Sequence, residues 1–429
     1  MRKFLVGACC CVGLSAFGME YKLGGKAESF GKFGFNSGSY NPKAFKNPTD
    51  SYASLFGAME FDVKAQNGFS ASLGGAINAL VYDSTSSQGG QSLGNGYIGA
   101  WFGYKGDKAM EARQYILHNA FVGYEGEYFG FKAGRYESSG LDWFGAWNQG
   151  GELYVGNKYV KLWGFYSDSR AMVYSNWFWD YTRFSVAGKG VYAGGLDVGT
   201  DSIKLSLYTY GSQDRFVAPG VKFAWNEALG EHLSNEFVAI GLFPINEENP
   251  KGMSGGSALV GKDTLFGDKL DKYTQTLFIR EQVNFYKHFA GVMLYKNWGN
   301  ANAWIGSYGD PFNGFDIWIG SAYDKGTSLS DMIGRNAITT IGYIGGDYGD
   351  FSWQILGRHT QSPRSDENAL ALTLNQRLYK ELSMRVKIEY FSDVTKAGYS
   401  VGSDDDTSPL SHNQTNDRSH IMTWLSQKF

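Results

Sequence analysis

Two stretches of this sequence imitate enzyme motifs, and neither has the context that the chemistry needs. Gly252-Met253-Ser254-Gly255-Gly256 has the spacing of a nucleophile elbow, but it lies in a long glycine-rich loop with no following helix to present the serine. Gly188 to Ala193 imitates a dinucleotide fingerprint without the required βαβ unit. We therefore predict no catalytic residue, no enzyme activity and no cofactor.

Metal binding has equally little support in the sequence. The six histidines show no H-x-x-x-H spacing. Asp404-Asp405-Asp406 offers oxygen ligands for a divalent cation, but the glycine and glutamate positions of a calcium loop are missing. A solvated acidic loop tip is the favoured interpretation, so we predict no metal site.

Basic residues carry a stronger signal, because they recur on the polar side of segments whose apolar residues alternate. Inside a barrel these side chains would face water, and basic side chains lining a pore attract carboxylates. The simpler interpretation is that any porous barrel needs charged lumen residues. The candidate selectivity residues are Lys204, Lys222, Arg280, Arg358, Arg377, Arg385 and Lys387.

Two further candidates lie near residue 140. Arg135 shares the parity of Phe129, Phe131 and Ala133, so it faces the lumen only if the strand has bulged or ended before it. Asp142 is expected to project from a loop and oppose the basic residues across the pore. Opposed charges across a narrow wet gap would orient zwitterions, an effect that salt weakens.

The elements that position these residues are read from the stretch 54–82. Every second residue from Leu55 is mostly apolar, and the interleaved residues are mostly polar. Period two indicates β-strands, and Asn67-Gly68 is a strong tight-turn signal. Each arm has about ten or eleven residues, the length that a tilted strand needs to cross a bilayer. The pattern favours a transmembrane β-barrel.

The same alternation predicts about eighteen strands, joined by short turns on one side and mostly long loops on the other, as in outer-membrane barrels. Charges on the polar side of the strands 367–377 and 382–391 predict a wet lumen. The predicted strands are 20–35, 54–65, 69–82, 113–124, 128–136, 150–156, 158–167, 189–198, 202–211, 216–227, 236–244, 273–285, 289–298, 337–345, 351–360, 367–377, 382–391 and 418–429.

The two ends of the chain fit this picture. Residues 1–18 have a basic start, an apolar run and small residues at Ala16 and Gly18, which predicts a signal peptide followed by a barrel over 19–429. All three cysteines lie in that leader, so no disulfide is predicted. The terminal Phe429, after alternating apolar residues, resembles the signal read by the barrel assembly machinery.

Charge and composition exclude other classes. The net charge is −3, and removing the leader takes away two positive charges, which argues against nucleic acid as a partner. Beyond residue 18 the sequence holds no run of 18 apolar residues, so helical membrane spans are not predicted. The many aromatic residues, 16% of the chain, suit girdles at two membrane interfaces.

One region of the sequence resembles the Hof outer-membrane family of Helicobacter. The resemblance lies in Gly134-Arg135-Tyr136, Trp143-Phe144, Gln149-Gly150 and the run Lys158 to Ala171. That family is similar to OprD-type porins and to the Campylobacter major porin. The resemblance implies an eighteen-stranded barrel whose third external loop, here 137–148, folds into the lumen, and a ladder of basic residues along one wall.

We therefore expect a porin of the Gram-negative outer membrane through which small hydrophilic solutes diffuse passively. It would contact outer-membrane lipid and lipopolysaccharide, act as a monomer or a homotrimer, and favour solutes that carry a carboxylate. Three alternatives remain. One is an adhesin that uses the long loops 83–112 and 299–336, and another is a fatty-acid-type transporter of hydrophobic substrates, which would need an N-terminal hatch. The third is a barrel-embedded hydrolase, which would need a Ser-His-Asp set at the rim, and the sequence offers none with plausible placement.

Overall fold

The computed structural model describes residues 18–35, 49, 51–84, 114–138, 140–183, 190–247, 271–302, 305, 309–312, 315, 331–399 and 409–429. Within these ranges the chain forms a 21-stranded antiparallel sheet and the short 3-10 helix η6 (Asp331–Ile333). Most of the predicted leader 1–18, the triplet Asp404 to Asp406 and the loop around Ser254 lie outside them. No helix of the described residues is long and apolar enough to cross a membrane.

The strands follow the chain in order around the sheet. They are β1 (Met19–Gly34), β2 (Tyr52–Ala65), β3 (Phe69–Asp83), β4 (Tyr115–Glu125), β5 (Phe129–Glu137), β6 (Trp147–Gly156), β7 (Val160–Val173), β8 (Phe178–Arg183), β9 (Val191–Gly199), β10 (Ile203–Ser212), β11 (Phe216–Ala228), β12 (Leu233–Leu242), β13 (Ile245–Asn246), β14 (Gln275–Phe285), β15 (His288–Trp298), β16 (Ile338–Asp347), β17 (Phe351–Gln361), β18 (Ser365–Tyr379), β19 (Leu382–Thr395), β20 (Gln414–Asp417) and β21 (His420–Lys428).

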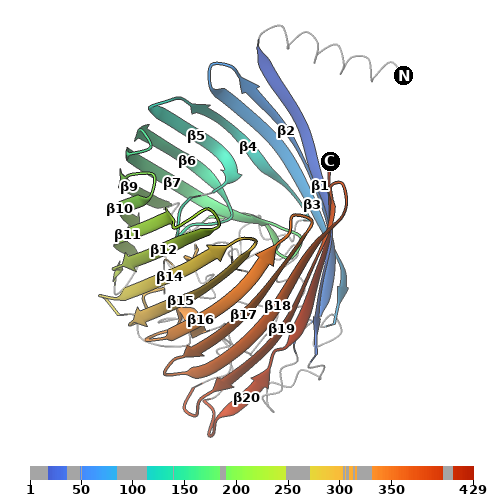
Figure 1. Cartoon of the computed structure of the whole chain (residues 1–429), viewed down its shortest axis with the longest axis vertical. Coiled ribbons are helices and arrows are strands. Elements are labelled where there is room, and N and C mark those ends of the chain that lie inside the picture. Colours follow the sequence, from blue (N-terminus) through green and yellow to red (C-terminus); the bar gives the residue numbers. More distant parts are fainter. Residues whose placement is uncertain are drawn as a thin grey trace.

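The sheet closes on itself, because β1 pairs with both β2 and β21 and brings the first strand beside the last (Figure 1). The short strands β8, β13 and β20 extend longer neighbours, so eighteen of the 21 described strands form the barrel wall. Each of these eighteen overlaps one strand predicted from the sequence. The prediction of an eighteen-stranded antiparallel barrel is therefore confirmed.

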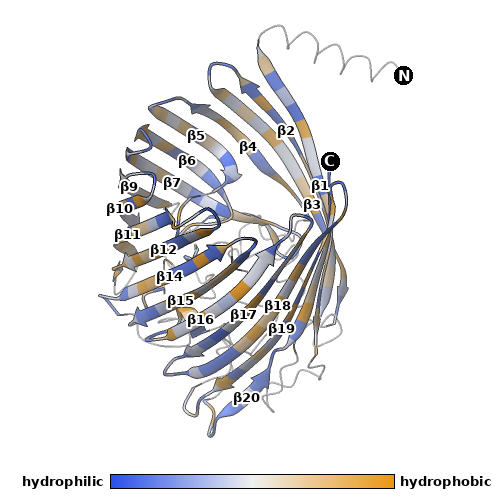
Figure 2. Cartoon of the chain, in the orientation of Figure 1, coloured by the Kyte–Doolittle hydropathy of each residue, from blue (hydrophilic) through white to orange (hydrophobic). Residues whose placement is uncertain are grey.

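Alternation along each strand assigns the two faces of the wall, and Figure 2 shows orange and blue residues alternating along the strands. In the first hairpin Leu55 and Ile77 are exposed on the outer face, whereas Phe56 and Asn78 are buried on the inner one. Gly68 closes the turn with φ of 93°, which suits glycine. The apolar face of the pattern is thus the face that meets lipid.

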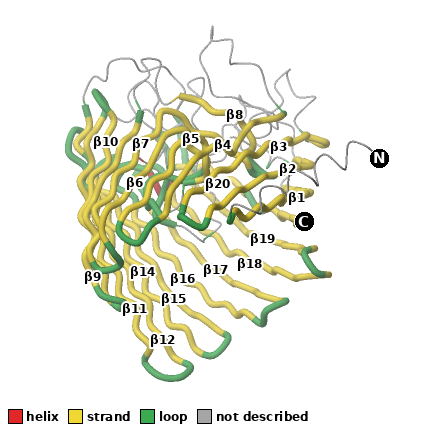
Figure 3. The backbone as a smooth tube through the Cα atoms, turned by 90° about the horizontal axis from the view of Figure 1, so that it is seen from above, coloured by secondary structure: helices red, strands yellow, loops and turns green. Residues whose placement is uncertain are grey.

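The connections are asymmetric, as the sequence predicts. Turns such as 66–68, 126–128 and 286–287 join the strands at one rim (Figure 3). At the other rim the connections are mostly longer, and the described residues of two stretches within them, 138–146 and 299–315, include side chains that pack inside the barrel. By the outer-membrane pattern, the short-turn rim is periplasmic and the other is external.

The interior is only partly wet, which differs from the expectation of a polar lumen throughout. One apolar cluster joins inward residues of β7, β9–β12 and β14–β17 to Trp143 and Phe144 of the 138–146 loop and to Phe312. A second joins inward residues of β1–β3 to Phe178 of β8. Alternation could not reveal these clusters, because Trp143, Phe144 and Phe312 of the first lie in connections between wall strands, and Phe178 of the second lies on a strand that the alternation did not predict.

Candidate functional site

The loop 138–146 follows β5 and crosses into the barrel. Trp143 and Phe144 are fully buried there, with the Phe144 ring 4.7 Å from that of Phe165. The backbone N–H of Trp143 donates to the Tyr210 hydroxyl on β10 at 3.4 Å. Gly309 of the 299–315 stretch lies against the same loop, so close that a side chain there would collide with its backbone. The two inward segments therefore pack as one layer.

A cavity of about 660 Å³ lies beneath the 138–146 loop. Its wall comes from β3–β7, β9–β12 and β14, and its lid includes Leu141 and Asp142. Five cations and five carboxylates line it, namely Lys132, Lys161, Lys204, Lys222 and Arg280, with Glu125, Asp142, Glu152, Asp197 and Glu236. The cavity is therefore rich in charged groups but close to neutral overall.

The charges on this wall are arranged as neighbouring pairs. Asp197 on β9 accepts a hydrogen bond from the Trp163 indole at 3.2 Å and lies 3.5 Å from Lys161 and 3.1 Å from Lys204. Lys161 and Asp197 are direct partners across the β7–β9 ladder, so the strand register itself brings them together. The side chain of Lys204 remains 50% exposed, which leaves its ammonium group available to a solute.

Two more pairs line the cavity. Lys222 on β11 donates to Asp142 of the loop at 2.6 Å, which ties the lid to the wall. Arg280 on β14 lies 3.4 Å from Glu236 on β12. Of the residues singled out from the sequence, Asp142, Lys204, Lys222 and Arg280 thus meet at one cavity.

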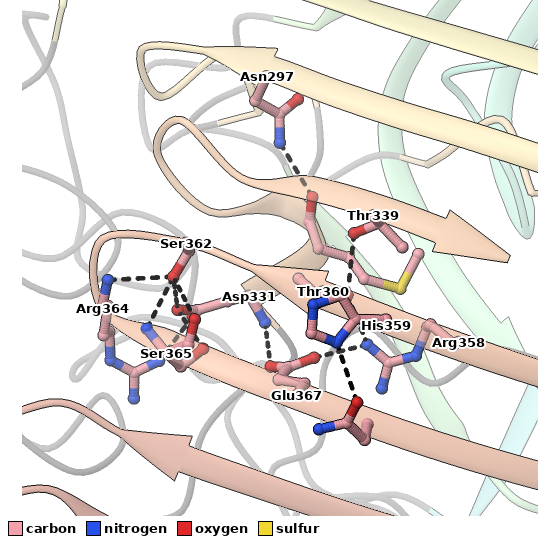
Figure 4. Close-up of polar contacts among 12 residues, drawn as sticks. Asn297, Asp331, Thr339, Arg358, His359, Thr360, Ser362, Arg364, Ser365 and Glu367 are labelled. Atoms are coloured by element: carbon pink, nitrogen blue, oxygen red, sulfur yellow. Dashed lines mark hydrogen bonds and ion pairs between the residues drawn. The ribbon is translucent and has the colours of Figure 1, made fainter.

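Arg358 lies elsewhere, in a buried network on the inner face of β17 and β18. Its guanidinium donates to Glu367, and Glu367 in turn accepts from the backbone N–H of Asp331 in η6 (Figure 4). The Asp331 carboxylate accepts hydrogen bonds from Ser362, Ser365 and, at 2.7 Å, Arg364. Arg358 therefore helps to hold the end of the 299–337 connection inside the barrel.

Lys387 and Arg385 lie on the inner face of β19. Lys387 is only 2% exposed and pairs with Glu389 at 2.7 Å, beside His420 of β21. The Arg385 guanidinium lies 4.8 Å from the centre of the Trp424 ring. These cations face inward as alternation predicts, but Lys387 is packed within protein and does not face open water.

Two predicted residues lie at the margins. Arg135 is absent from the described cavity lining, and its guanidinium bonds to Gln149 and to the Leu117 carbonyl and packs on the Tyr181 ring. Arg377 is 60% exposed at the short-turn rim, 3.3 Å from Asp350. Parity along a strand gives the face on which a residue lies but not its height along the barrel. This is why Arg377, predicted to line the pore, lies at the rim.

Sequence reasoning missed Lys132, Lys161 and Asp197 in the cavity and Asp331 in the buried network. The signal for Lys132 was present, because it has the parity opposite to Phe129 and Phe131 on a predicted strand. Lys161 likewise interleaves with Val160 and Leu162. Asp331 could not be found in this way, since it lies in a connection where no period applies.

Within the inward layer, Asp310 is partly buried near Arg170 of β7. Burial raises the pKa of the Asp310 carboxyl, while a hydrogen bond from the Phe312 backbone and the Arg170 charge oppose that rise. A carboxyl in this position favours its neutral form more than a solvated one does.

The comparisons agree with this architecture. A family model described as "Putative outer membrane protein" matches residues 6–429. No curated protein matches the chain. Similar solved structures include OccAB1 of Acinetobacter baumannii, with 10% identity, 96% of each chain covered and a TM-score of 0.61. OccK3 (OpdO) of Pseudomonas aeruginosa has the same values, and OccK8 (OprE) of that species has 11% identity, 96% and 98% coverage and a TM-score of 0.61.

Proposed function

Because the chain belongs to this family of outer membrane proteins and forms a closed eighteen-stranded barrel, we propose that it is a porin through which small hydrophilic solutes diffuse passively. The observation that carries the proposal is the cavity of about 660 Å³ inside the wall, lined by ten ionisable side chains. A transporter of hydrophobic substrates would need an apolar lining, so the cavity argues against that alternative.

The charges at the cavity support a preference for solutes that carry a carboxylate together with a positive group. Lys204 offers a half-exposed ammonium group, while Glu236 and Asp197 offer carboxylates on the same wall. Equal numbers of both signs give little net field, so simple salts should be weakly discriminated. A zwitterionic solute could instead separate one ion pair of the wall, with its carboxylate contacting the cation and its positive group contacting the carboxylate.

Replacing Lys204, Lys222 and Arg280 together with glutamine should shift the reversal potential in a salt gradient toward cation preference. The substitution removes three of the five cavity cations and leaves all five carboxylates. Because the field of solvent-exposed charges is screened by salt, the shift should shrink in molar salt. The measurement is single-channel or multichannel current in a planar bilayer at low and high ionic strength.

The matched control replaces Lys158 and Arg377 with glutamine. Both are exposed cations at the short-turn rim, and each has a carboxylate partner, Asp201 and Asp350. This variant should keep the parent selectivity. Equal selectivity of the triple variant and the parent at low salt would show that the three cavity cations do not face the permeation path.

Finer assignments are proposed on the same basis. Residues 1–18 would be removed as a signal peptide. The loop 137–148 would constrict the pore, and the burial of Trp143 and Phe144 inside the barrel supports this role. The motif run from Gly134 to Ala171 supports a place among the Helicobacter Hof proteins, related to the Campylobacter major porin. This proposed relationship to the Hof proteins and the Campylobacter porin rests on the motif residues and not on the fold.

A further inference from the structure

The strand β7 changes its partner on one side halfway along its length, while it stays paired with β6 up to Ala171. Up to Ser167 it pairs with β9, but from Ser169 onward it pairs with β8 instead. The ladder with β6 is irregular at the same place, with a register shift between Gln149 and Gly150. The second half of β7 and β8 thus form a hairpin, residues 169–183, that points into the barrel, and we call it the strap. Figure 1 shows the end of β7 running toward β1–β3.

The tip of the strap is docked on β3 and β2, which lie four and five strands away from β7 around the wall. Three successive backbone carbonyls lie at this tip. That of Tyr174 also closes the turn by accepting from the Trp177 N–H at 3.3 Å, and those of Ser175 and Asn176 would normally be hydrated at a hairpin tip. Here inward side chains of β2 and β3 donate to all three: Tyr52 to Asn176 at 2.8 Å, Ser54 to Ser175 at 2.5 Å, and Asn78 to Tyr174 at 3.1 Å and to Ser175 at 3.0 Å. The donors lie about a hundred residues away in the sequence.

The socket that receives the tip consists of Glu28, Tyr52, Ser54 and Asn78. Glu28 accepts from the Ser175 hydroxyl at 2.5 Å, and none of the four is more than 8% exposed. Buried polar side chains are costly unless they are hydrogen-bonded, so their presence on this wall is explained by the docked tip. The socket is therefore built for the strap.

Apolar contacts fix the strap beside its tip. Phe178 of β8 is fully buried with its ring 6.2 Å from that of Phe56, and the Tyr181 hydroxyl donates to the His118 carbonyl at 2.7 Å. The strap therefore runs from β7 to β1–β3 through the interior, and it is held at both its tip and its flank.

We propose that the strap is a second constriction of the permeation path and that the socket residues set its width by holding the tip against β1–β3. This inference rests on the proposed porin function. It differs from the 138–146 constriction, which reaches the wall of β10 and β11 through Tyr210 and Lys222.

Replacing Ser54 and Asn78 together with alanine removes the donors to two tip carbonyls. The freed tip should widen the path, so single-channel conductance should rise roughly twofold and larger neutral polymers should enter the pore. The matched control replaces Ser352 and Asn375 with alanine, an inward serine and amide that bond to each other at 3.1 Å away from the strap. The control should conduct like the parent.

A disulfide tests docking without relying on current. Cysteines occur only at positions 9–11, so a pair at Ser54→Cys and Ser175→Cys reports on these two sites alone. Their contact of 2.5 Å, from the Ser54 hydroxyl to the Ser175 carbonyl, brings the two backbones within reach of each other. The pair should form a disulfide in folded protein that spans residues 19–429, where no other cysteine occurs, and the oxidised form should conduct like the parent.

Four results decide the inference. Failure of the disulfide to form in folded protein would overturn it, as would a conducting parent whose alanine variant conducts no better than the control. If the parent carries no current and the alanine variant does, the strap closes the native barrel. That result would support the strap as a seal and overturn the proposal of passive diffusion through the native protein. Silence of the parent and of every variant would overturn both proposals.

Discussion

Replacing Asp331 with alanine is expected to destabilise the external half of the barrel interior by about 3–5 kcal/mol, the usual cost of removing one partner from a buried charge pair. Asp331 is 1% exposed, and its carboxylate accepts hydrogen bonds from Ser362, Ser365 and Arg364. Its backbone also docks on Glu367. The substitution leaves the Arg364 guanidinium buried without this carboxylate and removes the hydrogen bonds from Ser362 and Ser365, so that only the backbone bond to Glu367 still ties Asp331 to β18.

The change can be followed as the free energy of unfolding in urea and as protease cleavage within 331–337 of the folded barrel. The matched control is Asp201→Ala, which removes an exposed carboxylate paired with Lys158 at 2.9 Å. An exposed pair contributes at most about 1 kcal/mol, so this control should change little. If the two variants lost the same stability, the buried network would not anchor the connection.

Replacing Phe429 with aspartate should remove most of the assembled protein from the outer membrane. The Phe429 backbone exchanges hydrogen bonds with Gly25 of β1, and its ring lies over Gly25, where any other residue would collide with it. The residue thus completes the seam between β1 and β21 at the short-turn rim. A charge at this site would also face the apolar membrane interface.

The readout is the amount of barrel that resists SDS until it is heated. Phe429→Tyr is the matched control, because it keeps an aromatic ring over Gly25 and should assemble normally. An unchanged yield of the aspartate variant would show that Phe429 is not needed for assembly. The pairing of β1 with β21 would then depend on the other residue pairs of that ladder.

The strands could be predicted because membrane strands carry a local signal. Alternation marks each strand, and turn residues such as Asn67-Gly68 mark its end, so the number of strands and the outward residues such as Leu55 follow from sequence alone. The same signal places Lys204 and Lys222 on the inner face. The position of each strand and the face on which each side chain lies both follow from the alternation of neighbouring residues along one strand.

What could not be predicted depends on contacts between distant segments. The strap is invisible to alternation, because β7 continues as a strand while it changes partner from β9 to β8. Lys387 and Lys204 have equivalent patterns, yet one is 2% exposed and the other half exposed, since inward packing covers only part of the wall. Height along the barrel, which separates Arg377 from Arg280, is likewise not encoded in parity.

Planar-bilayer recording of the purified native protein tests the central claim most directly. The account predicts stepwise ionic currents with weak preference between simple anions and cations, and swelling of liposomes in solutions of small amino acids. The steps should vanish after the sample is heat-denatured. A folded barrel, resistant to SDS until heated, that never carries current and admits no solute would contradict the assignment as a porin.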